Sequence, residues 1–409
     1  MSEPDSPSDR SSLSIIFVTV FVDLLGFGIV IPLLPYYAET FHASGFVAGA
    51  VVACYSAMQF VFAPLWGRLS DRVGRRPVIL ISLLASTASY VLFAAANGLG
   101  LLFASRLLAG AGGANIAVAQ AFIADTTSER DRAKGMGLIG AAFGLGFTFG
   151  PAIGGLLAAR GHWAPGAAAA VICGINLLLA FWRLPESLPR EQRRPRAAAT
   201  RSHPLFEIAG ALRRPGLALL LALFAAAVFS FATMETTLSL LCASSFHLSA
   251  TQIYWLFGYM GLLTSLVQGG LIGRLSARLS ERHLTAGGCG LLALGLVATP
   301  FARPVLYLLL ALASLAVGQG IASPTLASLI SKASGAGEQG GVLGLSQSLG
   351  SLARILGPLW GGLLFDGAGP SAPYLTTGLL MVVAAVSALR IAAAAPVKMP
   401  AAARAGASG

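Results

Sequence analysis

Three ionisable residues lie inside long apolar stretches of the sequence, namely Asp23, Arg106 and Glu235. A charged side chain within a membrane is costly unless it faces a partner or an aqueous cavity, so such residues usually serve a function. We expect Asp23 and Glu235 to take part in proton coupling, with Arg106 reaching toward Asp23. Glu235 could instead contact a cationic substrate. Each also has a structural alternative: a capped carboxylate at Asp23, a helix clamp at Arg106 and a water-facing helix end at Glu235.

The apolar stretches around these residues are long enough to cross a bilayer. The 409 residues are 56% hydrophobic and 11% charged, and the mean hydropathy is +0.77. A soluble domain carries about 25% charged residues, and a bilayer core needs about 20 apolar residues per helix. We therefore predict an all-α membrane protein with twelve transmembrane helices. The predicted spans are Leu13–Pro35, Phe46–Trp66, Val78–Asn97, Leu99–Ala121, Met136–Ala158, Ala164–Leu184, Gly216–Cys242, Ala250–Ile272, Leu284–Ala302, Pro304–Ala327, Gly341–Leu364 and Pro373–Ala395.

Basic residues concentrate in alternate loops between the predicted spans. Cytoplasmic loops carry the excess of Lys and Arg, so these loops and both termini are expected to be cytoplasmic. The loops on the other side hold only Arg160 and Arg303. The formal net charge of +11 is then explained by orientation in the membrane, and no nucleic-acid partner is expected. Outside the arginine-rich middle segment, the expected cytoplasmic loops carry Arg68, Arg72, Arg75, Arg76, Arg130, Arg132, Lys134, Arg274, Arg278, Arg282 and Lys332.

The two halves of the chain repeat each other. The sequence Gly-Arg-Leu-Ser at 67–70 recurs at 273–276, and Gly-Pro at 150–151 recurs at 357–358. This repetition indicates a duplicated six-helix unit, with a substrate site near mid-membrane between the copies. We expect a tail at 1–12, a first half at 13–184, a cytoplasmic linker at 185–215, a second half at 216–395 and a tail at 396–409. The arginine-rich linker is either partly helical along the membrane surface or a disordered tether.

A short basic loop joins the second and third spans. It contains Gly67, Asp71, Arg72, Gly74, Arg75 and Arg76. Its pattern, Gly-x-Leu-Ser-Asp-Arg-x-Gly-Arg-Arg-Pro, resembles the signature loop between helices 2 and 3 of the major facilitator superfamily. The resemblance implies a cytoplasmic gate in which Asp71 lies near the start of helix 11, whereas the alternative is an ordinary basic loop. Asp125 ends the fourth span on the same side and could pair with the loop arginines.

The fifth span is rich in glycine. Its glycines and proline include Gly140, Gly144, Gly150, Pro151 and Gly154. Small residues four apart allow close helix contact, and proline permits a bend. The ending Gly-Pro-x-x-Gly-Gly resembles the motif of proton-coupled exporters of the superfamily. The alternative is a general glycine-rich packing face.

Several polar residues within the spans are candidates for substrate binding. They are Tyr55 and Gln59 in span two, Asn115 in span four, and Gln347 and Arg354 in span eleven. Tyr55 and Gln59 share a helical stripe, and Gln347 and Arg354 share a helix face. A stripe of this kind more often serves helix packing, which is the alternative.

Nearly the whole chain resembles the twelve-helix drug/proton antiporters, and most closely the bacterial tetracycline exporters. The resemblance is carried by Asp23 with Gly26-Phe27-Gly28, by Arg106-Leu107-Leu108 and by Ile123-Ala124-Asp125-Thr126-Thr127. Tetracycline exporters have an acidic residue in helix 3 and a histidine in helix 8. Ser89 and Thr264 stand at those places here, and helix 9 has no carboxylate, so the resemblance implies proton-driven export without specifying tetracycline.

The resemblance implies a secondary transporter that exports a small amphiphilic compound or drug in exchange for protons, and it implies that Arg106 takes part in the proton coupling. The expected location is a bacterial inner membrane, crossed many times by a monomer. The expected partners are the substrate, protons and the lipid bilayer, with the proton gradient as energy source and no cofactor or metal.

Two other functions stay open at this point. The chain could export one endogenous metabolite such as a sugar, a siderophore or a biosynthetic product. It could also be a receptor or scaffold that does not transport. An enzyme is not expected, because the Gly-x-Gly-x-x-G sequence at 335–340 follows a membrane span and lacks the strand that a dinucleotide site requires.

Overall fold

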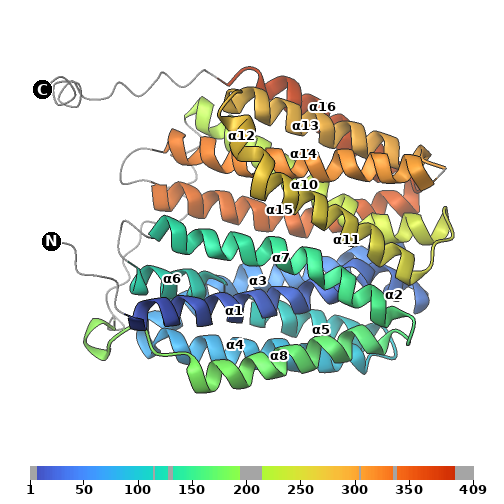
Figure 1. Cartoon of the computed structure of the whole chain (residues 1–409). Helices are drawn as coiled ribbons and strands as arrows, with labels where there is room; N and C mark the ends of the chain where they lie inside the picture. Colours follow the sequence, from blue (N-terminus) through green and yellow to red (C-terminus); the bar gives the residue numbers. More distant parts are fainter. Residues whose placement is uncertain are drawn as a thin grey trace, which may run out of the picture.

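The computed structural model of the chain describes residues 7–113, 116–127, 132–193, 214–303, 305–334 and 339–391. Within these ranges the chain is built from helices, and no strand is present. The helices lie side by side in two groups, blue to green for the first half of the chain and yellow to red for the second half (Figure 1). The predicted all-α architecture is confirmed.

The first half contains six membrane segments, several of which are composed of two helices. They are α1 (Pro7–Val30) with η1 (Ile31–Leu33) and α2 (Leu34–Thr40), α3 (Gly45–Val73), α4 (Arg75–Ala94), α5 (Leu99–Gly112) with α6 (Ile116–Thr126), α7 (Arg132–Ala158) and α8 (Trp163–Arg183). The short 3-10 helix η3 (Arg190–Gln192) follows in the linker.

The second half repeats this arrangement. Its segments are α10 (Pro215–Ser244), α11 (Ala250–Leu266) with the π-helix η4 (Val267–Leu271) and α12 (Ile272–Ser276), α13 (Glu281–Ala298) with η5 (Thr299–Phe301), α14 (Val305–Ala333), α15 (Gln339–Ala368) and α16 (Ala372–Ala388).

These segments follow the twelve predicted spans in order. Among the described residues, ten helices are long and apolar enough to cross a membrane, and Gly144–Ala158 and Ala372–Ala388 are shorter apolar helices. The boundaries differ in places. The first segment continues to Thr40, the fourth continues to Thr126, and α16 ends at Ala388 rather than at residue 395. Twelve helices are consistent with the superfamily fold.

Local sequence signals start and stop several helices. The Ser44 hydroxyl accepts a hydrogen bond from the Val47 amide at the start of α3, and Ser249 with Gln252 forms a capping box before α11. Gly74 separates α3 from α4 with φ +108°, a left-handed conformation that favours glycine.

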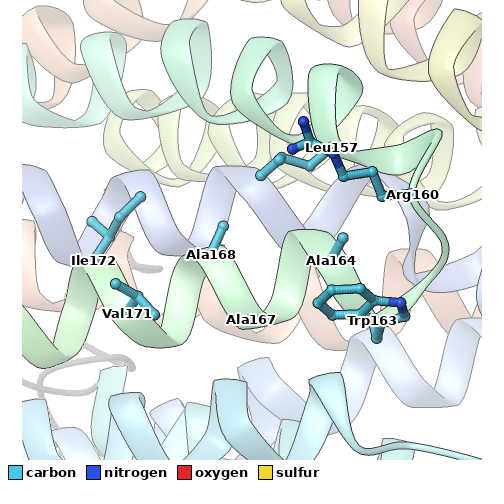
Figure 2. A pocket seen from close by; sticks show the side chains of 8 residues that line it. All are labelled: Leu157, Arg160, Trp163, Ala164, Ala167, Ala168, Val171 and Ile172. Carbon is cyan, nitrogen blue, oxygen red and sulfur yellow. The ribbon is translucent and has the colours of Figure 1, made fainter.

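The outer surface of the bundle is apolar, as lipid requires. Leu156, Trp182 and Leu379 are each more than 60% exposed, which suits hydrocarbon and not water. A hollow between the end of α7 and the start of α8 belongs to this surface (Figure 2). Its lining includes Trp163 and Val171, both exposed, so it is not an enclosed central site.

The two ends of the bundle differ in charge. The basic end carries the loop 67–77 and the Arg274 and Arg278 side chains, and it lies at the left in Figure 1, where α6 and α12 are labelled. The opposite end carries α2 and the turns before α3 and α11, at the right of the picture.

The glycines of α7 serve close packing against α1. Gly146 and Gly150 lie against Leu24 and Gly28, and a Cβ added to Gly150 would lie 2.6–2.9 Å from backbone atoms of Gly28 and Ile29. Gly154 lies against Tyr254 of α11. Gly144 is less crowded, since an added Cβ would meet only the Ser265 hydroxyl at 3.5 Å. Gly140 also lies in α7. The glycine-rich segment therefore packs helices of both halves together.

Gly150→Ala should destabilise the protein by about 1–3 kcal/mol, because the added methyl group overlaps the α1 backbone. Gly144→Ala is the matched control on the same helix. It should leave stability unchanged or raise it, since alanine is the better helix former and has room. Thermal unfolding of the two purified variants in detergent compares them. Equal melting temperatures would contradict the packing that we describe.

Candidate functional site

A cluster of charged and polar side chains occupies the centre of the bundle. It consists of Asp23 on α1, Tyr55 on α3, Arg106 on α5, Glu235 on α10 and Arg354 on α15. The charges of Asp23, Arg106 and Arg354 all act on the Tyr55 hydroxyl, and Glu235 and Arg354 act on each other. We call these five residues the central cluster. Its members come from both halves of the chain, as expected for a site at the interface between repeats.

Asp23 points into the protein and not into lipid. Only 8% of the residue is exposed, and its charge acts on Tyr55, on Tyr90 of α4 and on Cys173 of α8. A carboxylate buried among helices at this depth has the position expected of a functional acid. Its role in proton transfer remains a prediction.

Arg106 is fully buried between aromatic rings. Its guanidinium carbon lies 5.9 Å from the centre of the Tyr90 ring and 5.3 Å from that of Phe93. Nε donates to the Ser105 hydroxyl at 3.3 Å. Within the described residues, Nη2 has no hydrogen-bond partner. The rings supply a cation–π environment that helps to stabilise the buried charge. The expected pairing of Arg106 with Asp23 remains a prediction.

Tyr55 and Gln59 both contact the end of α5. Tyr55 fills the space beside Gly110 and Gly113, and its ring lies 4.9 Å from that of Phe27. The Gln59 side-chain amide donates to the Gly113 carbonyl at 3.0 Å, and Gly113 is the residue that directly follows α5. Gln59 therefore joins α3 to the end of α5. Asn115 lies outside the described residues.

Glu235 and Arg354 are the most accessible charges of the cluster. Both are half-buried, and Glu235 lies well inside α10 and not near its end. The one hydrogen bond between Arg354 and another described residue is a 3.4 Å contact from Nη2 to Ser351 on its own helix. Because lipid exposure would be costly for either group, their exposed parts indicate water between the halves. Gln347, two turns earlier on α15, is exposed.

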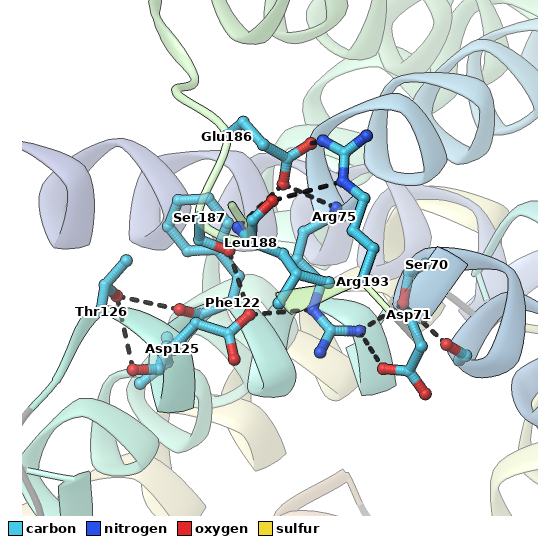
Figure 3. Close-up of polar contacts among 12 residues, drawn as sticks. Ser70, Asp71, Arg75, Phe122, Asp125, Thr126, Glu186, Ser187, Leu188 and Arg193 are labelled. Atoms are coloured by element: carbon cyan, nitrogen blue, oxygen red, sulfur yellow. Dashed lines mark hydrogen bonds and ion pairs between the residues drawn. The ribbon is translucent and has the colours of Figure 1, made fainter. Parts of the chain in front are cut away.

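At the basic end, Arg75 joins the loop to α6 (Figure 3). Its Nη1 binds Asp71 Oδ1 at 2.6 Å and the Ser70 hydroxyl at 2.7 Å, and its Nε binds Asp125 Oδ2 at 2.9 Å. The Arg75 side chain is only 9% exposed. The pairing between Asp125 and a loop arginine is therefore present. Among the other loop residues, Arg76 donates to the Phe181 carbonyl of α8, and Arg72 is exposed. A Cβ added to Gly67 would have no neighbour within 4 Å.

The first residues of the linker also bind this loop. The Glu186 carboxylate accepts from the backbone amides of Arg75 at 2.8 Å and Leu188 at 3.1 Å (Figure 3). The Ser187 hydroxyl donates to Asp125 Oδ2 at 3.2 Å. Glu186 thus places a negative charge at the N-terminus of α4, where the helix dipole favours it. Sequence reasoning missed Glu186 because its main partner is a backbone amide 111 residues away. The rest of the linker, 194–213, lies outside the described residues.

The halves meet at the opposite end. The Tyr254 hydroxyl of α11 donates to the Ile29 carbonyl of α1 at 2.7 Å, and Gly49 of α3 lies against the Pro358 carbonyl of α15. At mid-height, Thr148 and Ser265 share a 2.9 Å hydrogen bond between α7 and α11.

At the basic end, several glycines of both halves have open space beside them, because a Cβ added to any of them would have no neighbour within 4 Å. These are Gly67, Gly269, Gly270, Gly273 and Gly344. Within the described residues, the contacts of Tyr254, Gly49 and Thr148 join the halves at the opposite end and at mid-height.

This arrangement is that of a membrane transporter with two facing halves, and the comparison with known proteins gives its family. A sequence profile of the Major Facilitator Superfamily matches residues 16–358 and 241–407. The chain belongs to this superfamily, whose members that it resembles are transporters and not enzymes.

Curated relatives include bacterial tetracycline resistance proteins and a human protein. The class C tetracycline resistance protein of Escherichia coli is 36% identical over 359 residues, covering 86% of this chain and 88% of the relative. Major facilitator superfamily domain-containing protein 10 of Homo sapiens is 31% identical over 431 residues, covering 92% of each chain. The resemblance to tetracycline exporters is thus confirmed.

Solved structures share the fold. The human organic anion transporter MFSD10 has 28% sequence identity and a TM-score of 0.70, covering 94% of this chain and 100% of that one. A bacterial homologue of the lysosomal transporter Spinster, in an inward-facing and unoccupied conformation, has a TM-score of 0.71 at 15% identity, with 95% and 96% coverage.

Arg75→Gln should destabilise the protein by about 2 kcal/mol, because two carboxylates lose their charged partner at a partly buried position. The exposed neighbour Arg72 provides the matched control, and Arg72→Gln should unfold at the wild-type temperature. Thermal unfolding in detergent measures both. The Arg75 contacts would be unimportant for stability if the two variants behaved alike.

Proposed function

We propose that this protein exports a small amphiphilic compound or drug in exchange for protons, by alternating exposure of a central site to the two sides of the membrane. The observation that carries the proposal is the burial of Asp23 at the centre of a two-half bundle whose most accessible charges face the interface. A buried acid can gain or lose a proton only when water reaches it, so opening one side or the other can control the exchange. Membership in a superfamily of transporters and 36% identity to a tetracycline resistance protein support this reading.

We assign the roles within the central cluster as follows. Asp23, Arg106 and Glu235 handle the proton, while Tyr55 and Arg354 contact the substrate together with Gln347 and Asn115. Gln59 acts indirectly, by holding the end of α5 beside Tyr55. The proton gradient supplies the energy, so the protein needs no cofactor.

The orientation follows from charge. Since cytoplasmic loops carry the excess of basic residues, the basic end faces the cytoplasm of a bacterium and the chain is an inner-membrane protein with both termini inside. We propose that this conformation is open to the cytoplasm, because the hydrogen bonds that join the halves lie toward the other side. The loop 67–77, with Arg75 joined to Asp71 and Asp125, is the cytoplasmic gate. The functional unit is a monomer, since each chain contains both halves.

Arg354 favours an anionic group on the substrate. Its guanidinium is half-buried between the halves, and no ion pair holds it within the described residues. Gly350, one turn earlier on α15, leaves room for it, and the Phe224 ring lies nearby as an apolar neighbour. Charge-assisted hydrogen bonds to a carboxylate or phosphate would satisfy this group. The human relative is described as an organic anion transporter, which agrees with this choice.

The proton-exchange proposal is tested in everted membrane vesicles, whose interior corresponds to the periplasmic side. Respiration acidifies that interior, so protons leaving through an antiporter should drive uptake of tetracycline or another amphiphilic antibiotic from a growth-inhibition panel. Asp23→Asn should reduce uptake to background because the residue can no longer exchange a proton. The exposed Glu191→Gln serves as control and should transport as wild type. Uptake that survives a protonophore, or that Asp23→Asn retains in full, would contradict the proposal.

The substrate-charge proposal is tested by binding, without any gradient. The probes are dansyl-phenylalanine, which has a free carboxylate, and its methyl ester, which does not. Arg354→Gln should weaken binding of the acid by about tenfold and leave the ester unaffected, since one charge-assisted contact is lost. Arg354→Lys should recover part of the loss, and Arg303→Gln on the exposed surface should change nothing. Wild-type protein that does not prefer the acid, or equal weakening of both probes, would overturn the assignment.

A further inference from the structure

A carboxylate connects the two halves at the opposite end of the molecule. Asp366 lies near the end of α15, and its two oxygens accept hydrogen bonds from the first two amides of α3: Oδ1 from Gly45 at 2.7 Å and Oδ2 from Phe46 at 2.8 Å. The helices belong to different halves, and the contacting residues are 321 and 320 positions apart in the chain.

This contact is favourable for two electrostatic reasons. The first amides of a helix have no partner within the helix, and the helix dipole places partial positive charge there. Asp366 would be unfavourable at the C-terminal end of its own helix, where the dipole is negative, unless another group stabilises it. The cap residue Ser44 cannot replace it, because its hydroxyl accepts from Val47, two residues further along. The carboxylate therefore binds amides that would otherwise need water.

The surrounding backbone is shaped to let the carboxylate approach. Pro358, Gly362 and Asp366 are spaced four apart and lie on one face of α15. Gly45 and Gly49 have the same spacing on α3, and an added Cβ at Gly45 would lie 2.7 Å from Asp366 Oδ1 and 3.1 Å from the Gly362 carbonyl. The backbones of α3 and α15 therefore pack against each other here without intervening side chains. This close approach brings both oxygens of Asp366 within hydrogen-bond distance of the α3 amides.

We infer that Asp366 is a positioning residue that latches the two halves at the end opposite the basic loop, and that it must leave the first turn of α3 whenever this end opens. This inference rests on the proposed alternating access. Asp366 does not contact the central cluster, so it acts on the balance between conformations and not on the substrate.

The other end of the same helix pair differs in this structure. Asp71 lies near the end of α3, and it forms an ion pair with Arg75 of its own half. The antiparallel helices α3 and α15 thus carry one carboxylate near the end of each. Only Asp366, at the end opposite the basic loop, is engaged across the halves by a contact between described residues. The state of Asp366 therefore distinguishes the conformation in which the halves are joined at the opposite end.

The test measures distances between spin labels at the opposite end, in substrate-free protein with no pH gradient. Arg160→Cys and Arg303→Cys place the labels on exposed turns of the two halves. Cys54 is replaced by alanine, and the other three cysteines are buried. Asp366→Asn replaces a carboxylate that accepts from two backbone amides with a neutral side-chain amide, which fits these two donors less well. The variant should therefore raise the ratio of long to short distances between the labels about fivefold.

A second variant tests the same contact without changing charge. Gly45→Ala pushes the carboxylate away and should lengthen the distances in the same direction, which keeps the inference testable if Asp366→Asn does not purify as a folded protein. Glu39→Gln is the matched control, an exposed acid at the same end, and should leave the distances unchanged. Unchanged distances in both latch variants, or an equal shift in Glu39→Gln, would overturn the inference. Because no transport is measured, this result is independent of the test of proton exchange.

Discussion

Charge buried in an apolar bundle is the constraint on which the rest of this structure depends. Every ionised group at membrane depth must be stabilised by the protein or by water between its halves. Arg106 lies against aromatic rings, Asp23 is enclosed by helices of the first half, and Glu235 and Arg354 face the interface. The apolar exterior offers these groups no stabilisation, so the polar groups gather in the interior of the bundle.

Helix ends obey the same constraint. Glu186 accepts from the first amide of α4, Asp366 accepts from the first two amides of α3, and Gln59 donates to the Gly113 carbonyl just after α5. Each of these contacts joins segments far apart in the sequence. The three side chains therefore satisfy backbone groups near helix ends and hold distant segments together. Glu186 ties the linker to the first half, whereas Asp366 ties one half to the other.

Much of the fold could be predicted from the sequence because apolar length directly reflects bilayer thickness. The pairing of Asp125 with Arg75 followed from placing both on one side of the membrane. The π-helix η4 could not be found this way, since hydropathy does not depend on hydrogen-bond register. Asp366 was overlooked because it lies just beyond the predicted span. Its partners are backbone amides, which do not depend on residue type and therefore cannot be recognised in a sequence. Gln59 was expected to face a ligand, but a carbonyl of the same half occupies its amide.

The π-helix η4 has a mechanical consequence for the second half. Over Val267–Leu271 the backbone changes from i→i+4 to wider hydrogen bonding, and Gly269 and Gly270 have open space around them. A helix that contains a π-helical turn bends there at lower cost in free energy than elsewhere along its length. The short helix α12, which follows η4, can therefore change its tilt while α11 stays packed against α7. A change in the width of the basic end then does not require the whole segment from α11 to α12 to move.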